Sequence, residues 1–186
     1  MRLFISIDLP QKELNYLKNI QNQLCIGKFF EGRLTKKEQL HITIKFIDQI
    51  EEKNISAIQN LLELISFEPF KICLGNLEVI VKDKQVRLIW ITVLSKQLAL
   101  LVQQIENILE PFVAIESRSY TGHITLARVT AVKDRQQLIT HLNAIDIDSN
   151  ICFITNEFNL KQSVLFQEGS EYHIIETFPL MVKKEE

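Results

Sequence analysis

The sequence has few of the residues that interrupt regular structure, with 5 glycines and 4 prolines in 186 residues. This scarcity excludes collagen-like and low-complexity chains and leaves few candidate linkers. No apolar run approaches the ~20 residues that a membrane span needs. The first apolar run ends at Asp8, too early for a signal peptide. We therefore expect residues 1–186 to form one domain in the cytoplasm, with no membrane partner.

Charge of one sign is also missing, since 21 Lys and Arg stand against 23 Asp and Glu, a formal net charge of −2. A protein that coats duplex DNA by phosphate neutralisation needs a strongly basic face, which this balance argues against. A local basic segment does occur within 28–45; its charged residues are Lys28, Arg33, Lys36, Lys37 and Lys45 against Glu31 and Glu38. It either attracts an RNA end or is a solvated loop, and the sequence leaves both open.

Cysteine is scarce as well. The three residues, Cys25, Cys73 and Cys152, are odd in number and never form a C-x-x-C pair. This pattern suggests neither a disulfide framework nor a zinc ribbon. We expect three reduced, mostly buried thiols.

The apolar residues that are present indicate a mixture of helices and strands. Spacings of three and four residues predict helices at 14–24, 55–65 and 98–109 and a shorter one around 138–142. Residues that favour strands fill 3–7, 40–47, 70–81, 86–93, 123–129, 151–160, 163–167 and 172–181. Short connections at 82–85 and 168–170 read as hairpin turns, so much of the sheet should be antiparallel. The predicted fold class is α+β, and no dinucleotide-binding or P-loop motif accompanies it.

One four-residue pattern occurs twice, as His41-Ile42-Thr43-Ile44 and as His123-Ile124-Thr125-Leu126, 82 residues apart. In a strand, the histidine and threonine of each copy point to one face, ~6.6 Å apart, while the apolar residues point to the other. Burying such polar pairs is costly unless they are hydrogen-bonded. The duplication therefore predicts that both pairs line one wet cleft.

Two histidines and two threonines in one cleft favour acid-base chemistry at a phosphate. Histidine titrates near pH 6.5, so one imidazole can accept a proton while the other donates one. Threonine hydroxyls donate hydrogen bonds to phosphate oxygens, and Arg128 offers a guanidinium five positions after His123. We expect no metal and no other cofactor, because the histidines lack the H-x-x-x-H or carboxylate spacing of a metal hydrolase.

Three segments together resemble the two-histidine phosphoesterases, and specifically the bacterial and archaeal RNA 2′,3′-cyclic phosphodiesterases, also called 2′-5′ RNA ligases. These segments are 2–10, 40–46 and 123–128, the last two containing the repeated motif. The resemblance implies a bilobal fold with pseudo-twofold symmetry, in which mostly antiparallel sheets line a central cleft and the helices lie outside. It also implies RNA 3′ ends as partners, among which tRNA halves are one candidate. We expect a monomer.

The resemblance further implies a reaction and the role of each motif residue. Family members open a 2′,3′-cyclic phosphate at an RNA 3′ end to leave a 2′-phosphate, and the reverse reaction joins RNA halves by a 2′-5′ linkage without ATP. By motif position, His41 resembles the proton donor to the leaving 3′ oxygen and His123 the proton acceptor that activates water. Thr43, Thr125 and Arg128 are the expected phosphate ligands.

Two turns depart from the family's usual pattern. Members often have Pro before the second histidine and Gly after the Phe-Leu of the first motif, where this chain has Gly122 and Asp48. We expect altered loop geometry or substrate preference before any loss of activity, because these positions do not react. Arg128 adds a separate requirement, since in an ideal strand it would face away from His123. A bulge or strand end is needed there.

Three aromatic residues near the motifs, Phe46, Trp90 and Tyr120, could stack a base, as aromatics do in proteins that bind single strands. Core packing is the commoner role for such residues. Phe46 is our candidate platform, although the sequence does not rank the three.

Two other functions stay open on the sequence alone. A phosphoesterase of the same kind could act on small cyclic nucleotides, because the walls of the pocket and not the motif decide the substrate. The cleft could instead bind a nucleotide or an RNA end without turnover, although the presence of both histidines argues against this.

Overall fold

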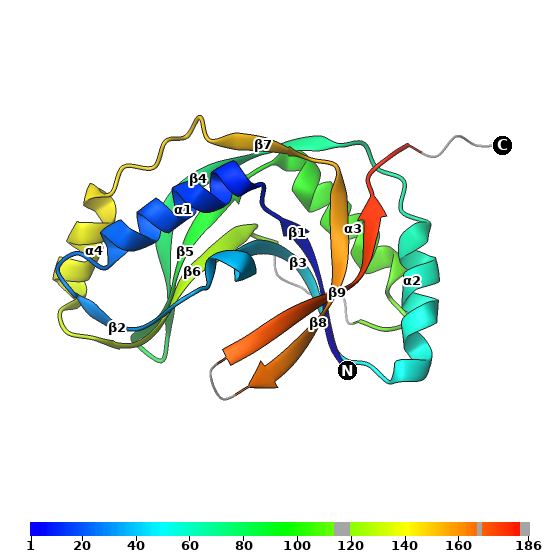
Figure 1. Ribbon diagram of the computed structural model, residues 1–186, viewed down its shortest axis with the longest axis horizontal. Coiled ribbons are helices and arrows are strands. Elements are labelled where there is room, and N and C mark those ends of the chain that lie inside the picture. The colour runs from blue at the N-terminus through cyan, green and yellow to red at the C-terminus, as the bar shows by residue number, and fades with distance from the viewer. Residues whose placement is uncertain (114–119, 167–168, 183–186) are drawn as a thin grey trace.

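The fold is built on one nine-stranded sheet with four α-helices, in a computed structural model that describes residues 1–113, 120–166 and 169–182 (Figure 1). The helices are α1 (Gln11–Leu24), α2 (Ile55–Glu63), α3 (Lys96–Ile108) and α4 (Arg135–Ala144). The strands are β1 (Arg2–Asp8), β2 (Phe30–Leu34), β3 (His41–Gln49), β4 (Phe70–Lys82), β5 (Gln85–Leu94), β6 (His123–Val132), β7 (Cys152–Thr155), β8 (Glu157–Phe166) and β9 (Gly169–Pro179).

The strand order places the two repeated motifs at the centre of the sheet. The order is β7-β4-β5-β6-β3-β1-β8-β9, so four strands lie on each side of the junction between β6 and β3, and β2 also pairs with β6. Every described pairing is antiparallel, and β3 meets β6 at the single pair Ile42 and Ile124. The α+β class and the pseudo-twofold arrangement of the sheet are therefore confirmed.

The helices form where apolar residues recur at helical spacing. α1 buries Leu17, Ile20 and Leu24 along one stripe, and α3 begins after Ser95, whose hydroxyl accepts a hydrogen bond from the Leu98 amide at 3.4 Å. Figure 1 shows α1 and α4 at one end of the sheet and α2 and α3 at the other. Among the described residues, no helix has the length and apolar character required to cross a bilayer.

The strand predictions need three corrections. The run 151–160 does not form one strand, because it is divided at Asn156 into β7 and β8. The run 163–167 is not a separate strand, because its residues up to Phe166 continue β8. β2 was missed because its middle residues, Glu31 to Arg33, are exposed and show no apolar alternation.

The predicted turns have different outcomes. The turn at 82–85 is confirmed: Asp83 and Lys84 have φ of 53° and 61°, as a two-residue hairpin loop requires. Of the predicted turn at 168–170, residue 168 lies outside the described residues. β8 and β9 pair antiparallel as far as Phe166 and Gly169.

The cysteine prediction was wrong for two of the three residues. Cys73 on β4 lies opposite Cys152 on β7, with Cα atoms 4.0 Å apart, and the two form a disulfide with an S–S distance of 2.09 Å. Their separation of 79 residues hid this pairing, because spacing along the chain does not show which strands are neighbours. Cys25 is free, as expected, but it is exposed rather than buried.

Candidate active site

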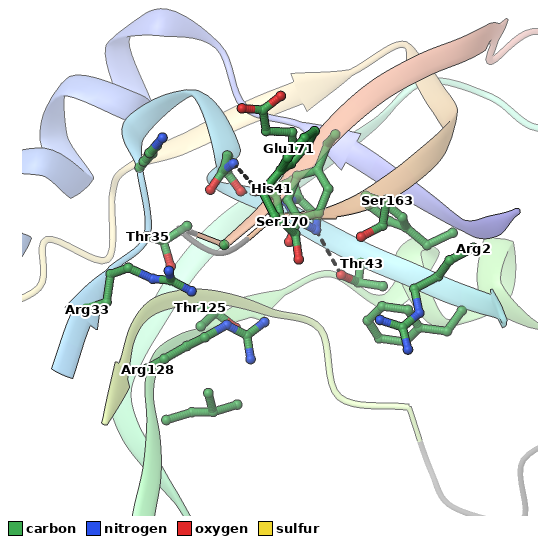
Figure 2. A pocket seen from close by; sticks show the side chains of 18 of the residues that line it. Arg2, Arg33, Thr35, His41, Thr43, Thr125, Arg128, Ser163, Ser170 and Glu171 are labelled. Carbon is green, nitrogen blue, oxygen red and sulfur yellow. Dashed lines mark hydrogen bonds between the residues drawn. The ribbon is translucent and has the colours of Figure 1, made fainter. Parts of the chain in front are cut away.

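A cleft of about 850 Å³ brings together all the residues predicted for the site. Its lining includes His41, Thr43 and Phe46 from β3 and His123, Thr125 and Arg128 from β6. Figure 2 shows His41, Thr43, Thr125 and Arg128 around the same opening. The two motifs enter the cleft from the two central strands, β3 and β6, which pair at Ile42 and Ile124 alone.

A bulge in β6 directs Arg128 into the cleft. On the neighbouring strand β5, Ile89 is opposite Ala127 but Trp90 is opposite Thr125, so Leu126 has no partner. Leu126 and Ala127 are consequently both buried, and the alternation of faces changes by one residue. This is the irregularity that the position of Arg128 required.

The first motif has the same bulge at the same place. On β1, Ile5 is opposite Lys45 and Ser6 is opposite Thr43, which leaves Ile44 without a partner. Ile44 and Lys45 are both buried, so Phe46 reaches the cleft five positions after His41, as Arg128 does after His123. The fold therefore places Phe46 and Arg128 at corresponding positions of the two halves.

His41 lies in a largely apolar environment at the cleft surface. Its ring centroid is 5.2 Å from those of both Phe4 and Tyr172. Burial lowers the pKa of His41 from 6.5 to about 4, and the hydrogen bond to the Gln39 carbonyl opposes this shift. The nearby Lys161 also lowers this pKa. Without a bound anion, His41 is therefore neutral near pH 7.

His123 has an equivalent environment in the other half of the sheet. Its ring centroid is 4.0 Å from that of Trp90. Burial lowers the pKa of His123, while the hydrogen bond to the Thr121 carbonyl raises it in part. Burial thus perturbs both histidines in the same direction and favours the uncharged form of each.

The backbone fixes which nitrogen of each imidazole is available for chemistry. Nδ1 of His41 lies 2.7 Å from the Gln39 carbonyl oxygen, and Nδ1 of His123 lies 3.0 Å from the Thr121 carbonyl oxygen. A carbonyl only accepts hydrogen bonds, so each Nδ1 carries a proton and each Nε2 accepts or carries the second one. In His41, Nε2 lies 3.1 Å from the Thr43 hydroxyl, which donates to it when the ring is neutral.

Only some of the basic residues in the segment 28–45 line the cleft. Arg33 and Lys36 line the cleft, whereas Lys45 is buried and forms an ion pair with Glu106 of α3 at 2.6 Å. Figure 2 shows Arg33 on the same side of the opening as Arg128, and Arg2 on the other side near Thr43. Lys45 therefore belongs to the packing of the bulge and not to the cleft.

Sequence reasoning missed several residues that line the cleft: Arg2, Phe4, Thr35, Gln39, Ser163 and Tyr172. Arg2 and Phe4 alternate along β1 and so share a face, a pattern visible in the sequence once that strand is assigned. The residues of β8 and β9 carry no motif. Their approach is a tertiary contact, in which the Gln39 side chain donates to the Ser170 carbonyl at 2.5 Å.

Two of the three candidate aromatics do not line the cleft. Trp90 packs on the ring of His123, and the Tyr120 hydroxyl donates to the Thr43 carbonyl at 2.8 Å. Burial raises the pKa of Tyr120, so its proton stays in place for this bond. Phe46 does line the cleft and is 59% exposed. Of the three, only Phe46 has the position that base stacking requires.

The structure gives a physical account of both unusual turn residues. Asp48 has a φ of 58°, a left-handed conformation that glycine adopts most easily and that aspartate tolerates better than most residues. At Gly122, a Cβ atom would lie 2.6 Å from Cγ2 of Val93 and 2.8 Å from Cδ2 of Leu98. Close packing, rather than φ, therefore favours glycine at 122.

No three histidine, cysteine, aspartate or glutamate side chains converge as a metal site in residues 1–113, 120–166 and 169–182. The functional groups that these residues bring together in the cleft are the imidazoles, hydroxyls and guanidinium groups described above.

Comparison with known proteins places this architecture in a family. Residues 11–157 match the 2′-5′ RNA ligase superfamily. A protein of Methanocaldococcus jannaschii named RNA 2′,3′-cyclic phosphodiesterase is 29% identical over 176 residues, covering 94% of this chain and 98% of its own. A protein of the same name from Methanothermobacter thermautotrophicus is 26% identical over 97% of this chain and 99% of its own. The chain belongs to the 2′-5′ RNA ligase superfamily.

Solved structures share the fold over almost the whole chain. TT0787 of Thermus thermophilus has a TM-score of 0.82 at 21% identity, covering 99% of this chain and 100% of its own. E. coli LigT, complexed with 3′-AMP, has a TM-score of 0.77 at 19% identity and covers 96% of each chain. At these identities the likeness concerns the fold.

Proposed function

We propose that this protein is an enzyme that hydrolyses RNA 2′,3′-cyclic phosphate ends to 2′-phosphate ends without a metal. One observation carries the proposal: two histidines from two central strands line one cleft, and a backbone carbonyl holds the Nδ1 of each. The names of the relatives from M. jannaschii and M. thermautotrophicus agree with it.

His41 and His123 divide the proton transfers between them. Nε2 of His123 takes a proton from water, whose oxygen attacks the phosphorus atom. The bond from phosphorus to the 3′ oxygen breaks, and the leaving 3′ oxygen takes the proton on Nε2 of His41. The 2′-phosphate remains, and one water molecule has been consumed.

The anionic substrate itself supplies the charge that this step needs. Although burial lowers the pKa of His41 to about 4 in the free cleft, a phosphate next to the ring stabilises the imidazolium and raises that pKa. Thr43 and Thr125 donate hydroxyl hydrogen bonds to the phosphate oxygens, and Arg128 adds a charged one. Phe46 stacks the terminal base.

The test uses a short RNA that ends in a 2′,3′-cyclic phosphate, incubated with the protein in EDTA. We expect a 2′-phosphate product, and we expect His41→Ala and His123→Ala each to lower kcat about 10²–10⁴-fold. His173→Ala is a matched control, because His173 on β9 is exposed and does not line the cleft. A 3′-phosphate product would reverse the assigned leaving group.

The other outcomes separate the two competing functions. Turnover of nucleoside 2′,3′-cyclic phosphates but not of RNA would favour a phosphoesterase for small cyclic nucleotides. Saturable binding of the RNA end with no turnover would favour a binding module. Loss of activity in EDTA would contradict the metal-independent reaction.

The proposal extends to the physiological setting of the enzyme. We propose that residues 1–186 act as one monomeric domain on RNA ends such as those of tRNA halves, and that the reverse reaction joins them without ATP. Sedimentation tests the monomer, and formation of a 2′-5′ junction from tRNA halves tests the ligation.

The cytoplasmic location stays a prediction from the sequence, and cell fractionation tests it. The Cys73–Cys152 disulfide makes that test worthwhile, because such bonds are rare in the cytosol.

A further inference from the structure

One end of the cleft, which we call the Phe46 end, has the components of a nucleobase site. Arg2, Phe4, Phe46 and Asp48 line it from the paired strands β1 and β3. Phe4 lies directly opposite Phe46, and their ring centroids are 6.2 Å apart. Phe4 is buried, whereas Phe46 is 59% exposed, so Phe4 supports a ring whose own surface is open to the cleft.

Asp48 is an unexpected residue at this end. Its backbone is in the left-handed region with a φ of 58°, which glycine would adopt with less strain. Within the described part of the chain, its carboxylate has no hydrogen bond or ion pair. It is also an anion in the lining of a cleft whose proposed substrate is an anion, so it weakens phosphate binding unless it contacts the substrate favourably.

We propose that the Asp48 carboxylate selects guanosine as the terminal nucleoside of the substrate. With the base stacked on Phe46, the two carboxylate oxygens accept hydrogen bonds from N1–H and from the 2-amino group of guanine. These two donors are adjacent on one edge of the base, which suits a bidentate contact with a carboxylate. The inference rests on the proposed function, because it assumes a nucleotide in this cleft.

The other bases match the carboxylate less well. Adenine and cytosine each offer one amino group beside a ring nitrogen that is itself an acceptor, and uracil offers a single N–H between two carbonyl groups. A base that presents an acceptor to Asp48 leaves two lone-pair groups facing each other. Arg2 also lines the cleft, on β1 next to the residue opposite Asp48, and supplies a cation that can donate to O6 of guanine, a contact that adenine cannot make.

The test compares binding and turnover separately, so that the two proposals can fail separately. Calorimetry measures the affinity for the four nucleoside 2′-monophosphates, and turnover is measured on four short RNAs that differ only in the nucleoside carrying the 2′,3′-cyclic phosphate. We expect the wild-type protein to bind the guanosine product about tenfold more tightly than the others, the usual order for one bidentate base contact.

Asp48→Asn is the diagnostic variant, because asparagine tolerates the same left-handed backbone and removes the charge and one acceptor. We expect the preference for guanosine to fall below about threefold, mainly through KM, since the base contact is present before the reaction starts. Asp83→Asn is the matched control: Asp83 also has a left-handed backbone, with φ of 53°, and lies in the turn between β4 and β5, away from the cleft.

Each outcome supports or overturns either the role of Asp48 or the proposed hydrolysis. Equal affinities for the four products in the wild type, or an unchanged preference in Asp48→Asn, would overturn the role of Asp48. If Asp83→Asn also loses the preference for guanosine, the loss comes from a general change in stability, and the role of Asp48 is overturned. Selective binding of the guanosine product without turnover of any RNA would support base selection and refute the proposed hydrolysis.

Discussion

Gln21 is expected to control the direction of Arg128 from a distance. Its side chain on α1 is fully buried, and its Nε2 donates to the carbonyl oxygens of Thr35 at 2.8 Å and of Leu126 at 2.9 Å. Leu126 is the bulge residue of β6, so this amide holds the irregularity that directs Arg128 into the cleft. Replacing Gln21 by methionine keeps the length of the side chain and removes both donors.

The structure sets the size of the effect on stability. The Leu126 carbonyl keeps a second hydrogen bond from the Thr35 amide at 2.9 Å, so only the Thr35 carbonyl loses its side-chain donor without a described replacement. Among the described residues, the buried Oε1 atom of Gln21 has no hydrogen-bond partner, so its removal is favourable. We therefore expect Gln21→Met to lower the free energy of unfolding by only about 1–2 kcal/mol, measured by urea denaturation.

The effect on activity should be larger than this modest loss of stability suggests. A charged hydrogen bond to phosphate contributes about 1.5–3 kcal/mol, so a misdirected guanidinium should lower kcat/KM about tenfold or more at a temperature where the variant is folded. Gln23→Met, on the exposed side of the same helix, should leave kcat/KM unchanged. In an Arg128→Met background, Gln21→Met should have little further effect. Fully additive losses in that double variant would refute the coupling.

Four other predictions concern three further parts of the molecule. The imidazole of His41 should titrate near pH 4 by NMR, and at higher pH when inorganic phosphate is added, because the anion favours the imidazolium. If phosphate leaves the midpoint unchanged, phosphate does not bind beside this ring. Since its folded pKa lies below the unfolded value, the stability from its neutral form is present above about pH 6.5 and falls by up to about 3 kcal/mol towards pH 4, which denaturation across that range would show. The variant with both Cys73→Ser and Cys152→Ser should lose about 4–5 kcal/mol of stability, because the bond closes a loop of 79 residues, and a reducing agent should not destabilise it further. Tyr120→Phe should lower stability by about 1 kcal/mol and kcat/KM several-fold, since its hydroxyl ties the segment before His123 to the Thr43 carbonyl; unchanged kinetics would make this bond structural only.

The local parts of the fold could be predicted well from the sequence. Helices such as α1 and α3 have stripes of Leu, Ile and Val that show in the sequence, and the tight turn at Asp83 and Lys84 follows short polar spacing between strands. β2 carries no such signal, because its pairing with β6 depends on backbone hydrogen bonds and its exposed residues have no apolar face. The disulfide was not predicted either, because it depends on the register between two strands that are far apart in the chain.

The site was predictable where residue identity carried the chemistry. His41 and His123 share a motif, and the face of Arg128 was correctly recognised as needing a bulge. The sequence does not show that Ile44 and Leu126 are the extra residues, because a bulge is a property of two strands together. Nor does it show that Tyr172 joins the site, because the hairpin of β8 and β9 reaches the cleft only through folding.

The carbonyl contacts of the two histidines have a consequence for evolution. In many enzymes a carboxylate side chain orients the catalytic imidazole, and a single codon change can remove it. Here the orienting groups are the main-chain oxygens of Gln39 and Thr121, which are present whatever side chain occupies those positions. Because Gln39 lines the cleft, drift at residue 39 can alter the lining while the imidazole of His41 keeps its tautomer. Such a lineage can explore new substrates without first losing the orientation of the two histidines that we propose as its acid and base.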